Sequence, residues 1–222
     1  MPIATLLLDL DGTIVTTEEL KLEAHRRTVA QLSGRDFITR DRYCELTGMS
    51  SWLMFKAILA ERPADCTYNQ YREVYKGYYR QLVQEQAQAH PGVLEFLQLA
   101  RTAGLNLVVV SSSSRTEMEL VLDQTGIQPL IDGFVSADDV EQPKPDPEPY
   151  RKALTITHSN PDQALALEDT DTGVESALAA GLPVIAVRHE LNGRHTFQGA
   201  RHVLHIKEIA DAPRFLSLLL SL

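Results

Sequence analysis

The chain has 222 residues, of which 44% are hydrophobic and 23% are charged, the composition of an ordinary globular protein with room for one large domain or for a domain with a smaller insert. Its net charge of -9 argues against general binding to nucleic acid or to an anionic membrane. Cys44 and Cys66 lack metal-type spacing and are expected to be reduced thiols. No apolar run reaches the roughly 20 residues that a membrane helix needs, so we expect a cytoplasmic protein with no nucleic-acid or membrane partner.

The first predicted strand lies in the stretch "LLLDLDGTIV", residues 6–15. It starts as an apolar run that should be buried, yet it carries Asp9 and Asp11, and Gly12 follows directly. Because side chains alternate across a strand, the two carboxylates are expected on the same side. Buried carboxylates repel each other and lose hydration. A bound cation is the simplest way to offset that cost.

Residues 16–90 are predicted to form an all-helical insert. Apolar residues recur at helical spacing in 18–32 and in 52–61, and the stretch 68–88 is long, polar and rich in tyrosine. We interpret those tyrosines as packing within the insert, not as a recognition surface.

From Pro91 onward, predicted helices and strands alternate. Strands are expected at 105–110, 133–137, 164–168 and 182–187, and helices at 91–104, 115–125, 147–157, 172–180 and 215–222. Such alternation predicts an α/β fold, a Rossmann-like parallel sheet covered on both faces. Residues 1–15 and 91–222 would form this core, with 16–90 as an inserted helical cap domain.

Polar groups follow several of the predicted strands. Residues 9–13 follow the first strand, Ser111 opens a run of serines after the second, and Glu168 and Asp169 follow "ALAL" in the fourth. Lys144 stands between two prolines ahead of a predicted helix. Ligands of an open parallel sheet bind beyond the carboxyl ends of its strands, so these side chains are expected on one rim.

This set of side chains suits phosphoryl transfer. Mg²⁺ prefers oxygen ligands and is typically held by one or two carboxylates and the substrate phosphate, and Asp9 and Asp169 can supply the carboxylates. Asp9 could then attack phosphorus, while Asp11 protonates the leaving alkoxide and later deprotonates the hydrolytic water. Ser111 would hold phosphate oxygens, and Lys144 would neutralise charge on both the phosphate and Asp9.

Four short motifs then carry a family resemblance: "DLDGTIV", the hydroxyl after "LVVV", "KPDPEPY" and "LEDTDTGVESALAAG". Their order resembles that of the haloacid dehalogenase superfamily, in its capped phosphatase and β-phosphoglucomutase-like branch. The resemblance implies that Asp9 is the nucleophile, Asp11 the general acid/base and Lys144 the lysine of the third motif. It also implies Mg²⁺ bound by Asp9, the main-chain carbonyl of Asp11 and the fourth-motif acids Glu168 and Asp169, mainly the latter.

The phosphate itself is expected to contact the first two motifs. The second-motif hydroxyl aligns best with Ser111, with Ser112 as the alternative, and the turn at Gly12 and Thr13 would bring backbone amides to the phosphate. The histidines are expected to be surface residues, although His189, with two neighbouring arginines, could fringe the site.

The chain also departs from the family in the insert. Thr16 stands where many capped relatives have an acid, Lys21 where they have a histidine, and Ser51 where mutase-like members often have an arginine. These positions read the leaving group, so the departures disfavour a sugar-phosphate mutase without touching the phosphoryl chemistry.

We therefore expect a Mg²⁺-dependent phosphatase of a small phosphorylated metabolite, acting through an aspartyl phosphate as a monomer or homodimer. A phosphomutase of the β-phosphoglucomutase type is the first alternative, because it shares the first half-reaction. A dehalogenase is disfavoured because Asp11 has no role when a halide leaves. A phospho-accepting regulatory or binding protein without turnover is more distant, since a signalling receiver would not explain the insert at 16–90.

Overall fold

The computed structural model describes residues 2–49, 51–61 and 66–221. Its centre is a six-stranded sheet with the order β3-β2-β1-β4-β5-β6, in which every neighbouring pair is parallel. The strands are β1 (Thr5–Leu8), β2 (Asn106–Val110), β3 (Gly133–Val135), β4 (Ala164–Glu168), β5 (Val184–Arg188) and β6 (His202–His205). The predicted α/β fold with a Rossmann-like sheet is confirmed.

Helices cover both faces of the sheet, which explains why the strands are apolar throughout. Leu6 and Leu8 point into one core, and Leu7 points into the other, as alternation along a strand requires. The first core is closed by α5 (Val93–Thr102), α6 (Arg115–Gln124) and α9 (Ala212–Ser221), and the second by α7 (Glu148–Thr157) and α8 (Asp171–Ala179). The Phe96 and Phe215 rings meet edge to face, 5.1 Å apart between centroids, and pack α5 on α9.

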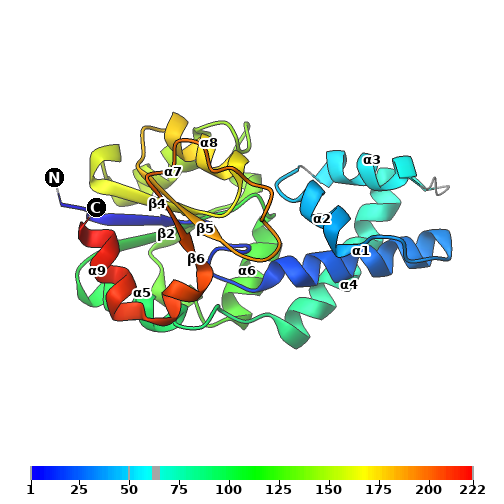
Figure 1. The fold of residues 1–222 in the computed structure, drawn as a ribbon, viewed down its shortest axis with the longest axis horizontal. Coiled ribbons are helices and arrows are strands. Elements are labelled where there is room, and N and C mark those ends of the chain that lie inside the picture. The colour runs from blue at the N-terminus through cyan, green and yellow to red at the C-terminus, as the bar shows by residue number, and fades with distance from the viewer. Residues whose placement is uncertain (1, 50, 62–65, 222) are drawn as a thin grey trace.

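The remaining helices lie beyond the carboxyl ends of the strands, at the right of Figure 1. They are α1 (Thr17–Ser33), α2 (Arg40–Leu46), α3 (Ser51–Glu61) and α4 (Tyr68–Gln86). They share a hydrophobic cluster that includes Leu22, Tyr43, Ile58 and Tyr71. These helices all lie inside the stretch predicted to be helical, although α2 itself was not foreseen.

Two adjacent chain segments join the helices α1–α4 to the sheet. The amide of Thr16 donates to the carbonyl of Gln88 at 2.9 Å, and the amide of His90 donates to the carbonyl of Ile14 at 3.1 Å. Residues 15 and 89 form an isolated antiparallel bridge between them. The chain therefore leaves the sheet and returns to it at the same place.

Some predicted boundaries need correction. β1 ends at Leu8, so Asp9 and Asp11 lie in the loop after the strand and are not placed by strand alternation. β3 ends at Val135, and β5 spans Val184–Arg188 instead of 182–187. The edge strand β6 was missed. Cys44 and Cys66 are not joined by a disulfide within the described residues. Across the described ranges, we find no helix with the length and apolar character needed to span a membrane.

Candidate active site

The predicted site residues meet at a cavity of ≈ 490 Å³ between the sheet and helices α1–α4. β1 lies between β2 and β4, and Leu8 pairs with Val109 on one side and Leu167 on the other. The residues that follow these three strands therefore emerge side by side, at the place where an open α/β sheet binds its ligands. The cavity lining includes six of the predicted residues: Asp9, Asp11, Ser111, Ser112, Lys144 and Asp169.

Lys144 joins the ends of three strands. Its Nζ donates to Asp9 Oδ1 at 2.7 Å, to Glu168 Oε1 at 2.5 Å and to the carbonyl oxygen of Val110 at 2.9 Å. The side chain is only 4% exposed. Burial alone would lower the pKa of Lys144, but the two carboxylates outweigh it and raise the pKa. The lysine is therefore a fixed cation beside Asp9.

Glu168 is held firmly by its neighbours. Besides Lys144, the hydroxyl of Tyr150 donates to its Oε1 at 2.5 Å, and the amide of Asp169 donates to its Oε2 at 3.2 Å. On the other side, a Cβ added to Gly173 of α8 would lie only 2.0 Å from the Glu168 carboxyl carbon. The fully buried Glu168 thus fills a fitted space and orients Lys144.

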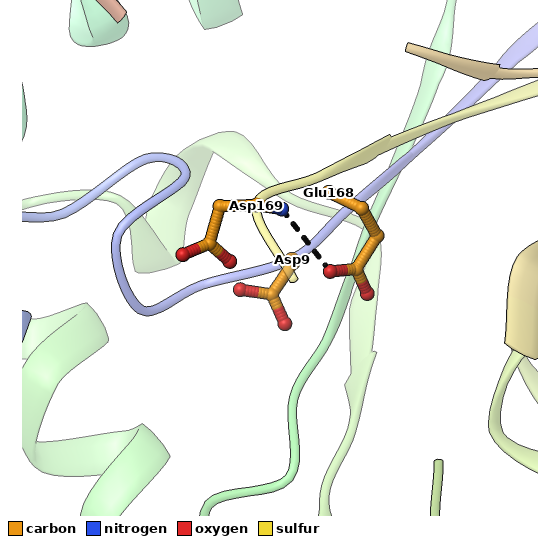
Figure 2. Close-up of side chains that lie close together, drawn as sticks. All are labelled: Asp9, Glu168 and Asp169. Carbon is orange, nitrogen blue, oxygen red and sulfur yellow. Dashed lines mark hydrogen bonds between the residues drawn. The ribbon is translucent and has the colours of Figure 1, made fainter. Parts of the chain in front are cut away.

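Three carboxyl groups gather at the ends of β1 and β4 (Figure 2). Asp9, Glu168 and Asp169 each offer an oxygen, and these oxygens lie within 4.8 Å of one another. Burial, with acidic neighbours, raises the pKa of Asp9 to about 8 even though Lys144 opposes the shift. Burial and Asp9 also raise the pKa of Asp169. A divalent cation such as Mg²⁺ prefers hard oxygen donors of this kind, and its charge would offset the cost of ionising them in a buried place.

The carboxylate of Asp11 belongs to a separate network. It accepts from the hydroxyls of Thr17 at 2.5 Å, Ser113 at 2.8 Å and Ser111 at 3.3 Å. Lys21 Nζ lies 3.1 Å from its Oδ2. Burial would raise the pKa of Asp11, but Lys21 and the hydroxyl donors lower it below its ordinary value. Ser113 was missed by sequence analysis, which considered only the first two serines of the run.

Gly12 brings the loop after β1 against Asp169. Its φ of +82° suits glycine, and an added Cβ would lie 2.5 Å from Asp169 Oδ2 and 2.9 Å from His189 Nε2. The next residue, Thr13, is fully buried, and its hydroxyl donates to Asp169 Oδ1 at 3.4 Å. In this structure the Thr13 side chain supports Asp169 instead of lining the cavity.

His189 is a site residue that the sequence analysis placed only at the fringe. Its Nδ1 accepts from the amide of Leu191 at 3.2 Å, so the neutral ring carries its proton on Nε2, which donates to Asp169 Oδ2 at 2.9 Å. Asn192 donates from Nδ2 to the main-chain carbonyl of Asp169 at 2.8 Å. The prediction that the other histidines lie on the surface is wrong for His25, which is 7% exposed.

Helices α1, α2 and α4 supply a second layer of contacts. Lys21, which replaces the family's histidine, also donates to Glu18 at 2.9 Å, and Glu18 accepts from the hydroxyl of Tyr43 at 3.0 Å. The hydroxyl of Tyr79 lies 3.4 Å from Asp11 Oδ1. Tyr71 packs within the insert as predicted, with Tyr68 and Tyr75 against it, and these tyrosines also line the cavity together with Tyr79.

The fold thus places a group of buried carboxyl side chains at the ends of parallel strands, beside a cavity. The chain belongs to the haloacid dehalogenase-like hydrolases, whose family pattern matches residues 6–187. It is 29% identical to the pyrophosphatase PpaX of Bacillus velezensis over 94% of both chains. With the crystal structure of CbbY from Rhodobacter sphaeroides in complex with phosphate it shares 28% identity and a TM-score of 0.81, over 94% of this chain and 96% of that one.

A putative β-phosphoglucomutase from Thermotoga maritima has the same fold, with a TM-score of 0.80 at 24% identity, over 96% of this chain and 100% of that one. At that identity the likeness concerns the fold alone. The family and the PpaX relatives identify the chain as a hydrolase of the phosphatase type.

Proposed function

We propose that the protein is a Mg²⁺-dependent phosphatase of a small phosphorylated metabolite and that Asp9 forms an aspartyl phosphate. The observation that carries the proposal is that two aspartates only two residues apart in the sequence belong to different networks of contacts. Asp9 lies in the cluster of carboxyl groups with Glu168 and Asp169, and it accepts a hydrogen bond from Lys144. Asp11 lies in a different network with hydroxyl groups and Lys21. One aspartate is therefore available as a nucleophile and the other as an acid/base.

The first step transfers the phosphoryl group to Asp9. Its Oδ1 is held by Lys144, so Oδ2 is free to form the new bond to phosphorus while the ester P–O bond breaks and the leaving oxygen keeps the electron pair. Asp11 donates a proton to that oxygen. Its pKa is lowered in the free protein, but the negative charge of an approaching phosphate favours the protonated form. Asp11 then accepts a proton from the water that hydrolyses the aspartyl phosphate.

The residues present also fit the metal that the family uses. Asp9 and Asp169 would hold Mg²⁺, with the main-chain carbonyl of Asp11 as the further ligand implied by the resemblance. Bound there, the cation would neutralise charge between the Asp9 carboxylate and the phosphate. We assign Glu168 mainly to Lys144, because both of its carboxylate oxygens already accept hydrogen bonds.

The remaining predicted residues would position the phosphate. Ser111 and Ser112 line the cavity beside Asp9, and the turn at Gly12 allows close approach of the backbone. Helices α1–α4 would act as a cap that keeps bulk water from the aspartyl phosphate and reads the leaving group.

The test is phosphate release from phosphoglycolate, pyrophosphate, sugar phosphates and nucleotides, with Mg²⁺ and with a chelator. Asp9→Asn keeps the shape of the side chain but removes the nucleophile, so turnover should fall by at least roughly 10³-fold. Asp123→Asn, at an exposed position on α6, is the matched control and should keep full activity. Turnover in Asp9→Asn would overturn the covalent mechanism, and isomerisation of a hexose 1-phosphate without phosphate release would indicate a phosphomutase.

A further inference from the structure

One face of α4 forms a wall of the cavity. The α4 residues that line it are spaced three or four apart, as residues on one helix face are. They are Tyr68, Tyr71, Arg72, Tyr75, Lys76 and Tyr79. The face therefore combines aromatic rings with two cations, and nothing in the phosphoryl chemistry uses those cations.

Arg72 and Lys76 differ from the other cations of the cavity in having no anionic partner. Lys144 and Lys21 each contact two carboxylates. Within residues 2–49, 51–61 and 66–221, neither Arg72 nor Lys76 forms an ion pair or a side-chain hydrogen bond. Like charges four residues apart on a helix repel each other. An anion bound between them would remove that repulsion.

The position of this pair sets how far such an anion lies from the reacting phosphate. Tyr79 marks the deep end of the wall, because its hydroxyl lies 3.4 Å from Asp11 Oδ1. Lys76 and Arg72 lie roughly 5 and 10 Å further along the helix axis, at 1.5 Å per residue. An anion held between these two side chains would thus belong to another part of the substrate than the transferred phosphate.

The surroundings suit a carbon skeleton between the two anionic groups. Trp52 of α3 lines the cavity and is 47% exposed, and its ring lies 5.1 Å from that of Tyr68 in an edge-on contact. Flat apolar surfaces of this kind pack against C–H groups of a ligand. Ser51, where mutase-like relatives often carry arginine, brings no charge, so basic groups on this wall come from α4.

We infer that Arg72 and Lys76 form a subsite for a second anionic group, a carboxylate or a phosphate. The substrate is then a phosphate ester that carries this group in another part of the molecule than the transferred phosphate. The inference rests on the proposed function, because the position of the transferred phosphate is set by Asp9.

The experiment compares probes that differ only in the second charge. Glucose 1,6-bisphosphate is paired with glucose 6-phosphate, phosphoglycolate is paired with ethyl phosphate, and p-nitrophenyl phosphate reports the basal activity. The double variant Arg72→Gln, Lys76→Gln should lose about 10- to 100-fold in kcat/KM on at least one doubly anionic probe, mainly through KM, since hydrogen bonds to charged groups are lost. Activity on p-nitrophenyl phosphate should stay within about twofold.

Arg80→Gln is the matched control, because Arg80 lies on the same helix, is exposed and does not line the cavity. It should leave all probes unchanged. Equal losses on charged and uncharged members of each pair, or no loss in the double variant, would overturn the inference. Failure of the wild type to hydrolyse any probe would count against the proposed function instead. Calorimetric binding of the same pairs to wild type and double variant would still decide the subsite, because a subsite requires tighter wild-type binding of the doubly anionic member.

Discussion

The two walls of the cavity balance their charges in different ways. On the sheet side, Lys144 donates to Asp9, Glu168 and a main-chain carbonyl. The Glu168 carboxylate also accepts hydrogen bonds from the Tyr150 hydroxyl and the Asp169 amide. On the helical side, α4 presents aromatic rings and two cations that have no anionic partner within the described chain. A side chain with every contact filled can hold one reacting group in one place. A cationic side chain without an anionic partner is suited to bind an anionic group of a ligand.

The largest effect should come from breaking the sheet side at its centre. Lys144→Met removes the cation between Asp9 and Glu168 and leaves buried carboxyl groups facing each other. We expect kcat to fall by about 10³-fold, because a positioned cation at the reacting centre is lost, and the melting temperature to fall as well. Steady-state kinetics and thermal unfolding measure the two effects.

Lys152→Met is the control for that variant. Lys152 pairs with Glu148 on the surface of α7, at 2.8 Å, so its loss should change activity by less than about twofold. Near wild-type kcat in Lys144→Met would show that the sheet-side wall does not depend on its lysine.

A smaller effect should follow from crowding the same wall without removing any functional group. In Gly173→Ala the new methyl would lie 2.0 Å from the Glu168 carboxyl carbon, so the carboxylate must move and Lys144 moves with it. We expect a loss of about 10- to 100-fold in kcat, because misplaced catalytic groups cost rate steeply. A crystal structure of the variant would show the displacement.

The helical side offers a matched change for comparison. Gly77 lies on α4 with nothing within 4 Å of an added Cβ, so Gly77→Ala should keep activity and stabilise the helix by up to about 1 kcal/mol. If Gly173→Ala were equally harmless, the fitted space around Glu168 would have no part in placing Lys144.

The smallest effect concerns stability on the helical side. His25 of α1 accepts or donates one hydrogen bond with Tyr71 at 2.8 Å and stacks on Tyr75, and burial lowers its pKa to about 3. The unfolded chain takes up a proton near the ordinary value of about 6.5, whereas the folded chain resists it. Stability is therefore fully present above that pH and declines as pH falls from about 6.5 toward 3.

Between pH 7 and pH 5 this linkage should lower the free energy of unfolding by about 2 kcal/mol, at 1.36 kcal/mol per pH unit below the pKa of the unfolded chain. His25→Gln should remove that part of the pH dependence, whereas His202→Gln, at an exposed position of β6, should not. Urea unfolding at both pH values measures the difference. The same decline in wild type and His25→Gln would contradict a neutral buried His25.

Much of the fold and of the sheet-side wall could be predicted from the sequence, because their signals are local. Continuous apolar runs gave β1, β2 and β4, and the polar residues that end those runs lie where parallel strands end together. Asp9, Asp11 and Asp169 meet for that reason, whereas Lys144 was predicted from its place between two prolines and from the third motif. The strand β6, "HVLH", is a mostly exposed edge strand without a long apolar run, and α2 has only seven residues, too few for a helical repeat to show.

Contacts that depend on three-dimensional neighbours were not predictable in this way. His189 reaches Asp169 only because β5 lies next to β4 in the sheet. Lys21 reaches Asp11 because α1 starts directly beyond the loop after β1. Neither histidine nor lysine carries a local signal for a buried partner, and both residue types are usually exposed or half-exposed.

The paired segments between the sheet and α1–α4 have a consequence for how such a protein evolves. Hydrogen bonds join Thr16 to Gln88 and His90 to Ile14. The stretch 17–86 is therefore inserted into the sheet domain like a loop whose two ends are held together. Doubling the length of a flexible loop costs only about 0.6 kcal/mol of closure entropy. A lineage can therefore lengthen, shorten or exchange the helices that recognise the leaving group while it inherits the reacting wall unchanged.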